Sequence, residues 1–340
     1  MMMMMMMMMM MMIGMGSSSS SSSSSSDILN DYVMVDMTQN NPGDSFGWQS
    51  TKYADPEYVT NELNFSGRVW TGESSGTLVI DYSSVPPGNI FPDGSPGRAW
   101  IESLKISMKR RLRRSKSVGS ETYFFVDLLV FPKALLEAVP EMTKDDGTTV
   151  EWNNVTKKYL SVMVKETFEL FPEVDGWIVR EGETYVYDTP YHIGNSPSNN
   201  TIARWIDFIT TLRQFVCVEA NKKLFVRSWD NWPSDKAYYL NMTSQIPPHE
   251  LLYFSIKHSA QDFVRPAQWN PMLGVGNHAQ IVEVELQREY ESKGALPNYV
   301  MDGAFFLSLI HSLTHSLTQL QGSSTDSRKW GQIRLDSRQL

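Results

Sequence analysis

The fold is decided by residues 251–298, LLYFSIKHSAQDFVRPAQWNPMLGVGNHAQIVEVELQREYESKGALPN. This stretch holds two short apolar runs, LLYFSI (251–256) and AQIVEVEL (279–286), and each run leads into a group of charged and aromatic residues. Buried parallel strands appear in sequence as nearly continuous apolar runs. The pattern therefore predicts two parallel strands, each followed by a polar loop.

The chain before this stretch alternates apolar runs with amphipathic helices. Strands are predicted within residues 122–131, 175–185 and 222–232, and helices over 151–171 and 201–218. Strands that alternate with helices indicate a parallel sheet with right-handed crossovers. We therefore predict an α/β fold of the (β/α)8 TIM-barrel type. Five strands are clear, and a complete barrel needs eight, so the first strands of the barrel are not identified.

Residues 27–120 have a less regular pattern, rich in Gly, Pro, Ser, Asn and Asp. A strand is predicted at 76–82 (GTLVIDY), a second candidate strand at 68–70, and a helix at 100–116. The helix ends in a basic cluster, for which a solvated helix face is favoured over a nuclear-targeting or polyanion-binding segment. The cluster comprises Lys109, Arg110, Arg111, Arg113 and Arg114.

Low-complexity sequence begins the chain. Residues 1–12 are methionine and residues 17–26 are serine, a composition without the pattern of a specific core or the basic start of a signal peptide. We predict a disordered tail at 1–26, an irregular region at 27–120 with a candidate first strand, the barrel at 121–321 and a second disordered tail at 322–340. An apolar stripe over 304–320 predicts the last outer helix.

Composition limits the classes of partner. The chain has 340 residues, a net charge of −8 and one cysteine, Cys217, so no intramolecular disulfide forms. We expect neither nucleic acid nor a membrane as partner, and the oligomeric state stays open. Four sequons would carry glycans only in a secreted chain, which leaves the localisation open; they lie at Asn64, Asn154, Asn199 and Asn241.

Three carboxylates follow predicted strands: Glu183, Asp262 and Glu289. In a (β/α)8 barrel, the functional residues lie just past the C-terminal ends of the strands, so these three are expected at one mouth. Glycoside cleavage needs an acid that protonates the leaving oxygen and a carboxylate that activates water or attacks the sugar. Taken singly, each carboxylate is better explained as a solvated loop charge, but that explanation is weaker for the three together, since each follows an apolar run.

Two blocks in the deciding stretch resemble the xylan α-glucuronidases, glycoside hydrolase family 67. That family carries Lys-Asn-Gly-Pro-x-Asp-Phe and, after a loop, Glu-x-Gln-x-x-x-Glu-Tyr. Here the blocks are KHSAQDF (257–263) and EVELQREY (283–290), so Asn-Gly-Pro is missing. Arg265-Pro266 is similar to an Arg-Glu-Pro that follows in the family. The resemblance covers roughly residues 120–302, with its specific motifs confined to 257–290.

The resemblance implies removal of an α-linked uronic acid from a polysaccharide or oligosaccharide by inversion, without a cofactor or metal. The general acid of the family lies on Val-Lys-x-x-x-Glu-Gly, and its nearest match here is VREGE (179–183). This implies that Glu183 is the acid, with Glu181 as a competing residue. Asp262 and Glu289 match the pair that activates water.

The resemblance also implies basic residues that bind the uronate, at Arg180, Arg227 and Lys257. Arginine suits this role because its planar fork binds a carboxylate through two hydrogen bonds. Salt bridges to neighbouring acids are an equally good explanation of the three residues. Trp229 is a candidate sugar-stacking side chain, although most such tryptophans pack in a core or at its rim.

Other interpretations remain open at the level of sequence. The missing Asn-Gly-Pro favours a barrel with another sugar specificity, and a non-catalytic or truncated carbohydrate-binding protein is a further alternative. His311 and His315, four residues apart on a predicted helix, could share a metal. An ordinary polar helix face explains them better, since no glutamate lies between them as in a zinc protease.

Overall fold

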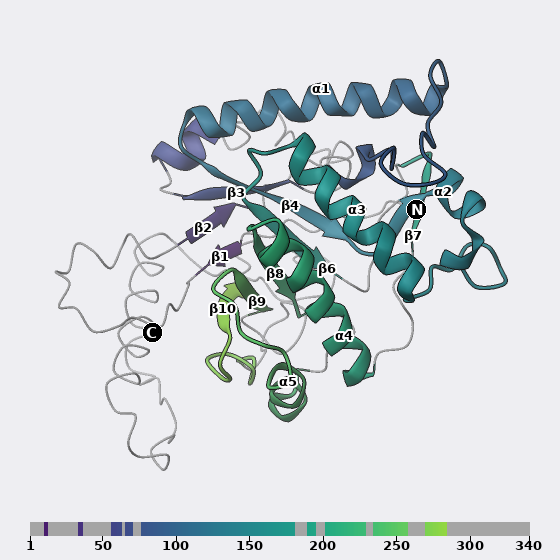
Figure 1. Ribbon diagram of the computed structural model, residues 1–340. Helices are drawn as coiled ribbons and strands as arrows, with labels where there is room; N and C mark the ends of the chain where they lie inside the picture. Colours follow the sequence, from purple (N-terminus) through teal and green to yellow (C-terminus); the bar gives the residue numbers. More distant parts are fainter. Residues whose placement is uncertain are drawn as a thin grey trace, which may run out of the picture.

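Figure 1 shows the protein as a computed structural model, which describes residues 10–12, 33–36, 56–62, 65–70, 76–180, 189–194, 201–228, 234–257 and 269–283. A curled, mainly parallel sheet forms its centre, with the strand order β1-β10-β9-β8-β6-β4-β3-β2, which closes on itself. The strands are β1 (Met10–Met12), β2 (Val33–Asp36), β3 (Gly67–Trp70), β4 (Glu121–Asp127), β6 (Gly176–Arg180), β8 (Lys223–Arg227), β9 (Leu252–Lys257) and β10 (Ala279–Glu283).

All neighbouring strands from β2 to β10 in this order run parallel. The exception is β1, which pairs antiparallel with both β2 and β10. Because β1 departs from the parallel order, the sheet is a (β/α)8-type barrel that is incomplete in its first strands, which confirms the predicted fold class. Met10–Met12 belongs to the methionine run that we excluded from the fold on sequence. The rest of 1–26 and the whole of 322–340 lie outside the described residues, so the two predicted tails stay predictions.

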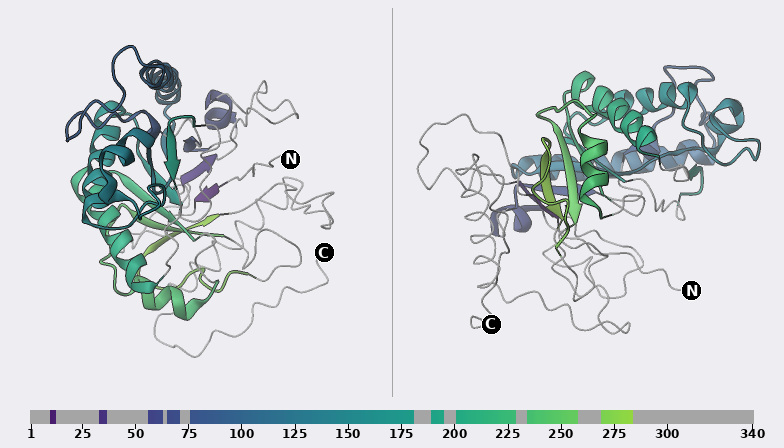
Figure 2. Two further views of the ribbon diagram at one scale, coloured as in Figure 1. Left: turned by 90° about the vertical axis from the view of Figure 1, so that its right-hand side faces the viewer. Right: turned by 90° about the horizontal axis from the view of Figure 1, so that it is seen from below.

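Helices cover the outer face of the sheet (Figures 1 and 2). They follow the strands in alternation as α1 (Pro96–Ser117), α3 (Asn154–Leu170), α4 (Ile202–Leu212) with its continuation η8 (Arg213–Glu219), and α5 (Lys236–Thr243). Each of these four α-helices begins at a residue whose side chain accepts a backbone N–H of the first turn, which satisfies one of its unpaired donors. The caps are Ser95, Asn153, Thr201 and Asp235.

Shorter elements complete the described part of the chain. They are the helical turns η4 (Tyr58–Glu62), η6 (Thr77–Val79) and η7 (Pro140–Met142), the helix α2 (Lys133–Ala138), and a two-stranded antiparallel sheet of β5 (Val130–Pro132) and β7 (His192–Gly194). In chain order β5 follows β4 and β7 follows β6. The small sheet thus joins the connections that leave the C-terminal ends of two neighbouring barrel strands.

Successive side chains of each barrel strand point to opposite faces of the sheet. One set packs outward against the helices in a continuous apolar core that includes Phe124, Trp177, Val226 and Phe254, each at most 2% exposed. The other set points into the barrel, where Phe225 lies against Tyr123 and Tyr253 with ring centroids 5.1 and 4.8 Å apart. The outer face therefore holds the fold together, and the inner face is available for polar groups.

A polar cluster occupies the N-terminal end of the barrel interior. The Lys223 ammonium donates to Glu121 Oε1 at 2.8 Å and to the Tyr123 hydroxyl at 3.2 Å, and that hydroxyl donates to Glu121 Oε2. Burial and the neighbouring Glu121 raise the pKa of Tyr123 well above its ordinary value. Tyr123 therefore stays protonated at neutral pH, as a hydrogen-bond donor must.

The predicted strand at 76–82 is wrong, because Thr77–Val79 forms a 3-10 turn. Gly76 begins the turn with a φ of 75°, and the Phe124 ring packs so close to its Cα that no side chain would fit. The predicted strand at 122–131 divides into β4 and β5. The five strands identified from sequence, the candidate strand at 68–70 and the three helices at 100–116, 151–171 and 201–218 are confirmed. The helix predicted at 304–320 lies outside the described residues.

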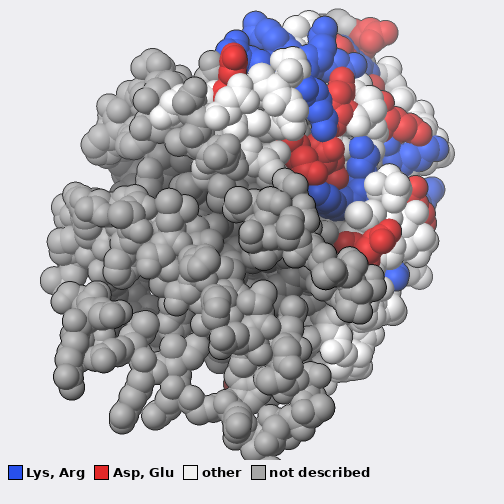
Figure 3. All heavy atoms as spheres, turned by 90° about the vertical axis from the view of Figure 1, so that its left-hand side faces the viewer, with Lys and Arg blue, Asp and Glu red and all other residues white. Residues whose placement is uncertain are grey.

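The basic cluster of α1 is partly engaged within the fold. The Arg111 guanidinium lies 5.4 Å from the centroid of Trp70, and Arg113 Nε donates to the Lys109 carbonyl at 3.1 Å. Figure 3 shows Lys and Arg side chains next to Asp and Glu over the described surface in that view. These contacts agree with a solvated helix face.

Replacing Gly176 with alanine is expected to destabilise the barrel. The new Cβ would meet the backbone carbonyl of Lys223 on the neighbouring strand, well inside van der Waals contact. Overpacking of this kind costs about 1–3 kcal/mol. Urea denaturation should show the loss, with Ser103→Ala on the exposed face of α1 as a comparison. A Gly176→Ala protein as stable as the wild type would mean that β6 and β8 pack less closely.

Candidate functional site at the C-terminal end of the barrel

Charged side chains converge inside the barrel at the C-terminal ends of its strands. The register pairs Asp127 of β4 with Arg180 of β6, and Arg227 of β8 with Ser255 of β9. The same pairing places Glu283 of β10 opposite Lys257 of β9. All of these positions belong to the inward-facing set, so the parallel alignment of the strands brings them to one end of the interior.

Arg227 and Glu283 form a buried ion pair. Arg227 Nε donates to Glu283 Oε2 at 2.9 Å, and Arg227 Nη2 donates to Glu283 Oε1. The Ser255 hydroxyl donates to the same carboxylate at 3.1 Å. The side chains of the pair are only 2% and 1% exposed. Three neighbouring strands thus meet at one carboxylate.

A second pair lies on the adjacent strands. Arg180 Nε donates to Asp127 Oδ1 at 2.8 Å, and Arg180 Nη2 reaches the same oxygen at 2.7 Å. Both arginines also lie over the ring of Phe125, whose centroid is 5.1 Å from the Arg180 Cζ and 5.2 Å from the Arg227 Cζ. Phe125 therefore joins the two pairs into one arrangement.

The arrangement brings two of the predicted basic residues together and places the third beside them. Arg180 and Arg227 converge on Phe125, and Lys257 ends β9 at the position paired with Glu283. Salt bridging, the alternative interpretation of these residues, is present for both arginines. Five other predicted site residues lie outside the described residues: Glu181, Glu183, Trp229, Asp262 and Glu289.

Sequence reasoning missed Asp127, Ser255 and Glu283. Asp127 is inside the apolar run 122–131, and Glu283 was treated as an alternating residue of a strand. The alternation of side chains along a strand was a usable signal. Residues two apart point to the same face, and Asp127 lies two residues after Phe125, as Arg227 lies two residues after Phe225. The pairing of specific charges needed the strand register, which no local pattern provides.

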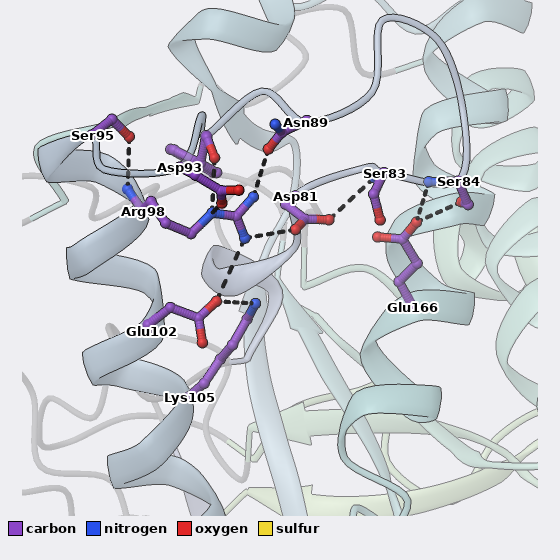
Figure 4. Close-up of polar contacts among 11 residues, drawn as sticks. Asp81, Ser83, Ser84, Asn89, Asp93, Ser95, Arg98, Glu102, Lys105 and Glu166 are labelled. Carbon is purple, nitrogen blue, oxygen red and sulfur yellow. Dashed lines mark hydrogen bonds and ion pairs between the residues drawn. The ribbon is translucent and has the colours of Figure 1, made fainter.

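The connection between β3 and α1 is fixed on the outside of the barrel (Figure 4). Arg98 of α1 donates to Asp81 at 2.8 Å, to Asn89 at 2.7 Å and to the Phe91 carbonyl at 2.8 Å. Burial raises the pKa of Asp81, but its hydrogen bonds with Arg98 and Ser83 and the nearby Lys105 together outweigh this, so the pKa is lowered. This network supports the fold and lies apart from the charge pairs.

Two further titratable groups are buried without a role in the site. Burial and the nearby Lys133 lower the pKa of His192 to about 3, so the imidazole is neutral at physiological pH. Burial raises the pKa of the Cys217 thiol to about 12, which keeps it in the unreactive thiol form. Neither group can therefore supply charge or a nucleophile at neutral pH.

Among the described residues, no group of three metal-ligating side chains lies together. His311 and His315 are outside the described part of the chain. No described helix is both long and apolar enough to cross a membrane.

No protein-family model matches the chain, and no curated protein matches its sequence significantly. Several solved structures are similar in fold at low identity. They include a GH138 enzyme that targets pectin rhamnogalacturonan II, with 13% identity over 65% of this chain and a TM-score of 0.38. The GH20 β-N-acetylhexosaminidase of Streptomyces coelicolor A3(2) has 12% identity over 62% and a TM-score of 0.33.

A D-psicose 3-epimerase is similar to the same degree, with 7% identity over 62% of this chain and a TM-score of 0.35. The matched part spans only 24%, 41% and 59% of the GH138 enzyme, the hexosaminidase and the epimerase, respectively. Likeness at this level concerns the architecture of the barrel. It says nothing about the reaction or the substrate of this chain.

Replacing Arg227 with methionine should destabilise the protein by about 3–5 kcal/mol, because Glu283 would remain buried without its counterion. The double variant Arg227→Met/Glu283→Met removes both charges and should recover most of that loss. Denaturant unfolding of the wild type, the two single variants and the double variant measures the coupling. Additive losses would contradict a direct interaction between the two side chains.

Proposed function

We propose that the chain is a glycoside hydrolase that acts at the C-terminal end of its barrel. The observation that carries this proposal is the pair of arginine–carboxylate contacts inside that end, Arg180–Asp127 and Arg227–Glu283. Buried charges are costly unless they are paired, and inward-facing strand ends are where (β/α)8 enzymes place their functional groups. A rigid layer of paired charges suits a polar ligand such as a sugar.

The proposed catalytic carboxylates come a few residues after the charged residues at the strand ends. Glu183 is three residues beyond Arg180, Asp262 five residues beyond Lys257, and Glu289 six residues beyond Glu283. In the proposed mechanism, Glu183 protonates the leaving oxygen, and Asp262 and Glu289 together activate a water molecule on the opposite face of the sugar. Inversion of this kind needs the acid and the base to be about 6.5–9.5 Å apart.

The proposed substrate group is an α-linked uronic acid. Glu283 holds Arg227 through Nε and Nη2 at the C-terminal end of the interior, and guanidinium groups suit the binding of carboxylates. Arg180 has the same kind of partner in Asp127. Lys257 ends the neighbouring strand β9 and adds a third cation at this level.

A barrel with another sugar specificity is the second candidate, and one observation favours it. Both arginines already have carboxylates of the chain itself as partners, so an anionic sugar has to compete with them. The missing Asn-Gly-Pro agrees with this alternative. A carbohydrate-binding protein without activity would share the barrel and differ in the outcome of the hydrolysis test.

The proposal predicts hydrolysis of uronic-acid-decorated oligosaccharides, with the released sugar in the inverted anomeric form. Glu183→Gln, Asp262→Asn and Glu289→Gln should each lower kcat at least about a hundredfold, as expected for loss of a general acid or base. Proton NMR of the first product reports the anomer, and the exposed Glu250→Gln is a matched control. Absence of hydrolysis over a broad glycan panel would reject the proposal, and unaltered rates in the Glu183→Gln protein would give the acid role to another residue such as Glu181.

The uronate proposal predicts that Lys257→Met weakens binding of glucuronic acid about tenfold and binding of glucose much less, since one charged hydrogen bond contributes about 1.5–3 kcal/mol. Lys257 ends β9 at the strand position paired with Glu283, so this variant removes one cation of the proposed site and keeps the Arg227–Glu283 pair. Calorimetric titration with both sugars makes the measurement, and Lys165→Met, on an exposed face of α3, is the control. Equal affinity of the wild type for both sugars would contradict the uronate specificity and leave a neutral-sugar hydrolase.

A further inference from the structure

Glu283 is the most completely buried carboxylate at the C-terminal end of the described barrel. Its side chain is 1% exposed and its oxygens receive Arg227 Nε, Arg227 Nη2 and the Ser255 hydroxyl. These donors come from β8 and β9, while Glu283 itself ends β10. The carboxylate is therefore held in place by two strands and can act only through its fixed charge and hydrogen bonds.

A buried, fixed charge exerts an electrostatic effect on groups that it does not contact. The electrostatic energy between two unit charges rises as the effective dielectric constant falls, and burial also protects the charges from screening by salt. Arg227 alone would present a full positive charge to any ligand at the mouth of the barrel. With Glu283 beside it, the pair presents a dipole with no net charge, so attraction toward an anionic sugar is much reduced.

We propose that Glu283 determines the charge selectivity of the sugar site by neutralising Arg227. This inference rests on the proposed function, since it assumes that a sugar binds at the C-terminal end. Glu283 does not touch the sugar in this proposal and takes no part in bond cleavage. Its charge sets how strongly a uronic acid is preferred over a neutral sugar of the same shape.

The Asp127–Arg180 pair differs in a way that makes Glu283 the better candidate. The Asp127 side chain is 15% exposed and binds Arg180 through a single oxygen, whereas both Glu283 oxygens bind Arg227. Solvent screens a partly exposed charge more than a buried one. Changing the charge of Glu283 should therefore alter selectivity more than the same change at Asp127.

The test is Glu283→Gln, which keeps the shape of the side chain and one acceptor oxygen but removes the negative charge. We expect the ratio of glucuronic acid affinity to glucose affinity to rise about tenfold, the order of magnitude of one uncompensated charge acting across several ångströms. Titrations with the two sugars at low and high salt provide the ratio. An unchanged or lower ratio in a folded Glu283→Gln protein would overturn the inference.

A matched control lies at the opposite end of the same barrel. Glu121 pairs with Lys223 at 2.8 Å, with side chains 32% and 24% exposed, so Glu121→Gln removes the same charge from a more exposed pair far from the proposed site. Its affinity ratio should stay at the wild-type value. A rise equal to that of Glu283→Gln would overturn the inference, because it would assign the effect to overall charge.

A second comparison is available if Glu283→Gln fails to fold. Arg227→Met/Glu283→Met removes both charges, and because the pair has no net charge, the ratio should stay at the wild-type value. A marked fall in the ratio would reject the inference, since it would show that Arg227 attracts the uronate in spite of Glu283. If the wild type binds neither sugar, the proposed function itself fails; if it binds sugar and the ratio does not rise in Glu283→Gln, only the role of Glu283 fails.

Discussion

The apolar layer between the curled sheet and its helices is the constraint on which the rest of the structure depends. Outward-facing side chains such as Phe124, Trp177 and Phe254 are almost completely buried in it. Because successive residues of a strand alternate between faces, this layer fixes the other half of each strand toward the interior of the barrel. The charge pairs at the strand ends are positioned by the packing on the other side of the sheet.

Local pattern was enough to predict the repeated strand–helix units and the fold class, since these depend on apolar periodicity and helix caps. It failed at 76–82, where β-branched and apolar residues resemble a strand. Gly76 instead adopts a positive φ under the Phe124 ring, so a contact with a distant residue overrides local preference. The strand β1 was not predicted because it lies in the methionine run, and β2, with four residues, was not recognised in the irregular region 27–120.

Prediction of the candidate site succeeded for the side chains whose strand ends were recognised. Arg180 and Arg227 were predicted as strand-end cations. In the structure each belongs to one of the two ion pairs, and both lie over the ring of Phe125. Their partners, Asp127 and Glu283, depend on which residues face one another across strands. Such register is a property of the assembled sheet, so no sequence spacing could have assigned these pairs. For Arg227 the structure shows the salt bridge that was one of the two interpretations of this residue from sequence.

The polar cluster of Glu121, Tyr123 and Lys223 affects how a ligand can approach the interior of the barrel. Its hydrogen bonds cross the interior at the N-terminal end, directly beneath the stacked rings of Phe225 and Tyr253. At this end the interior is occupied by side chains that bind one another. A ligand of Arg180 and Arg227 is therefore expected to approach them from the C-terminal ends of the strands.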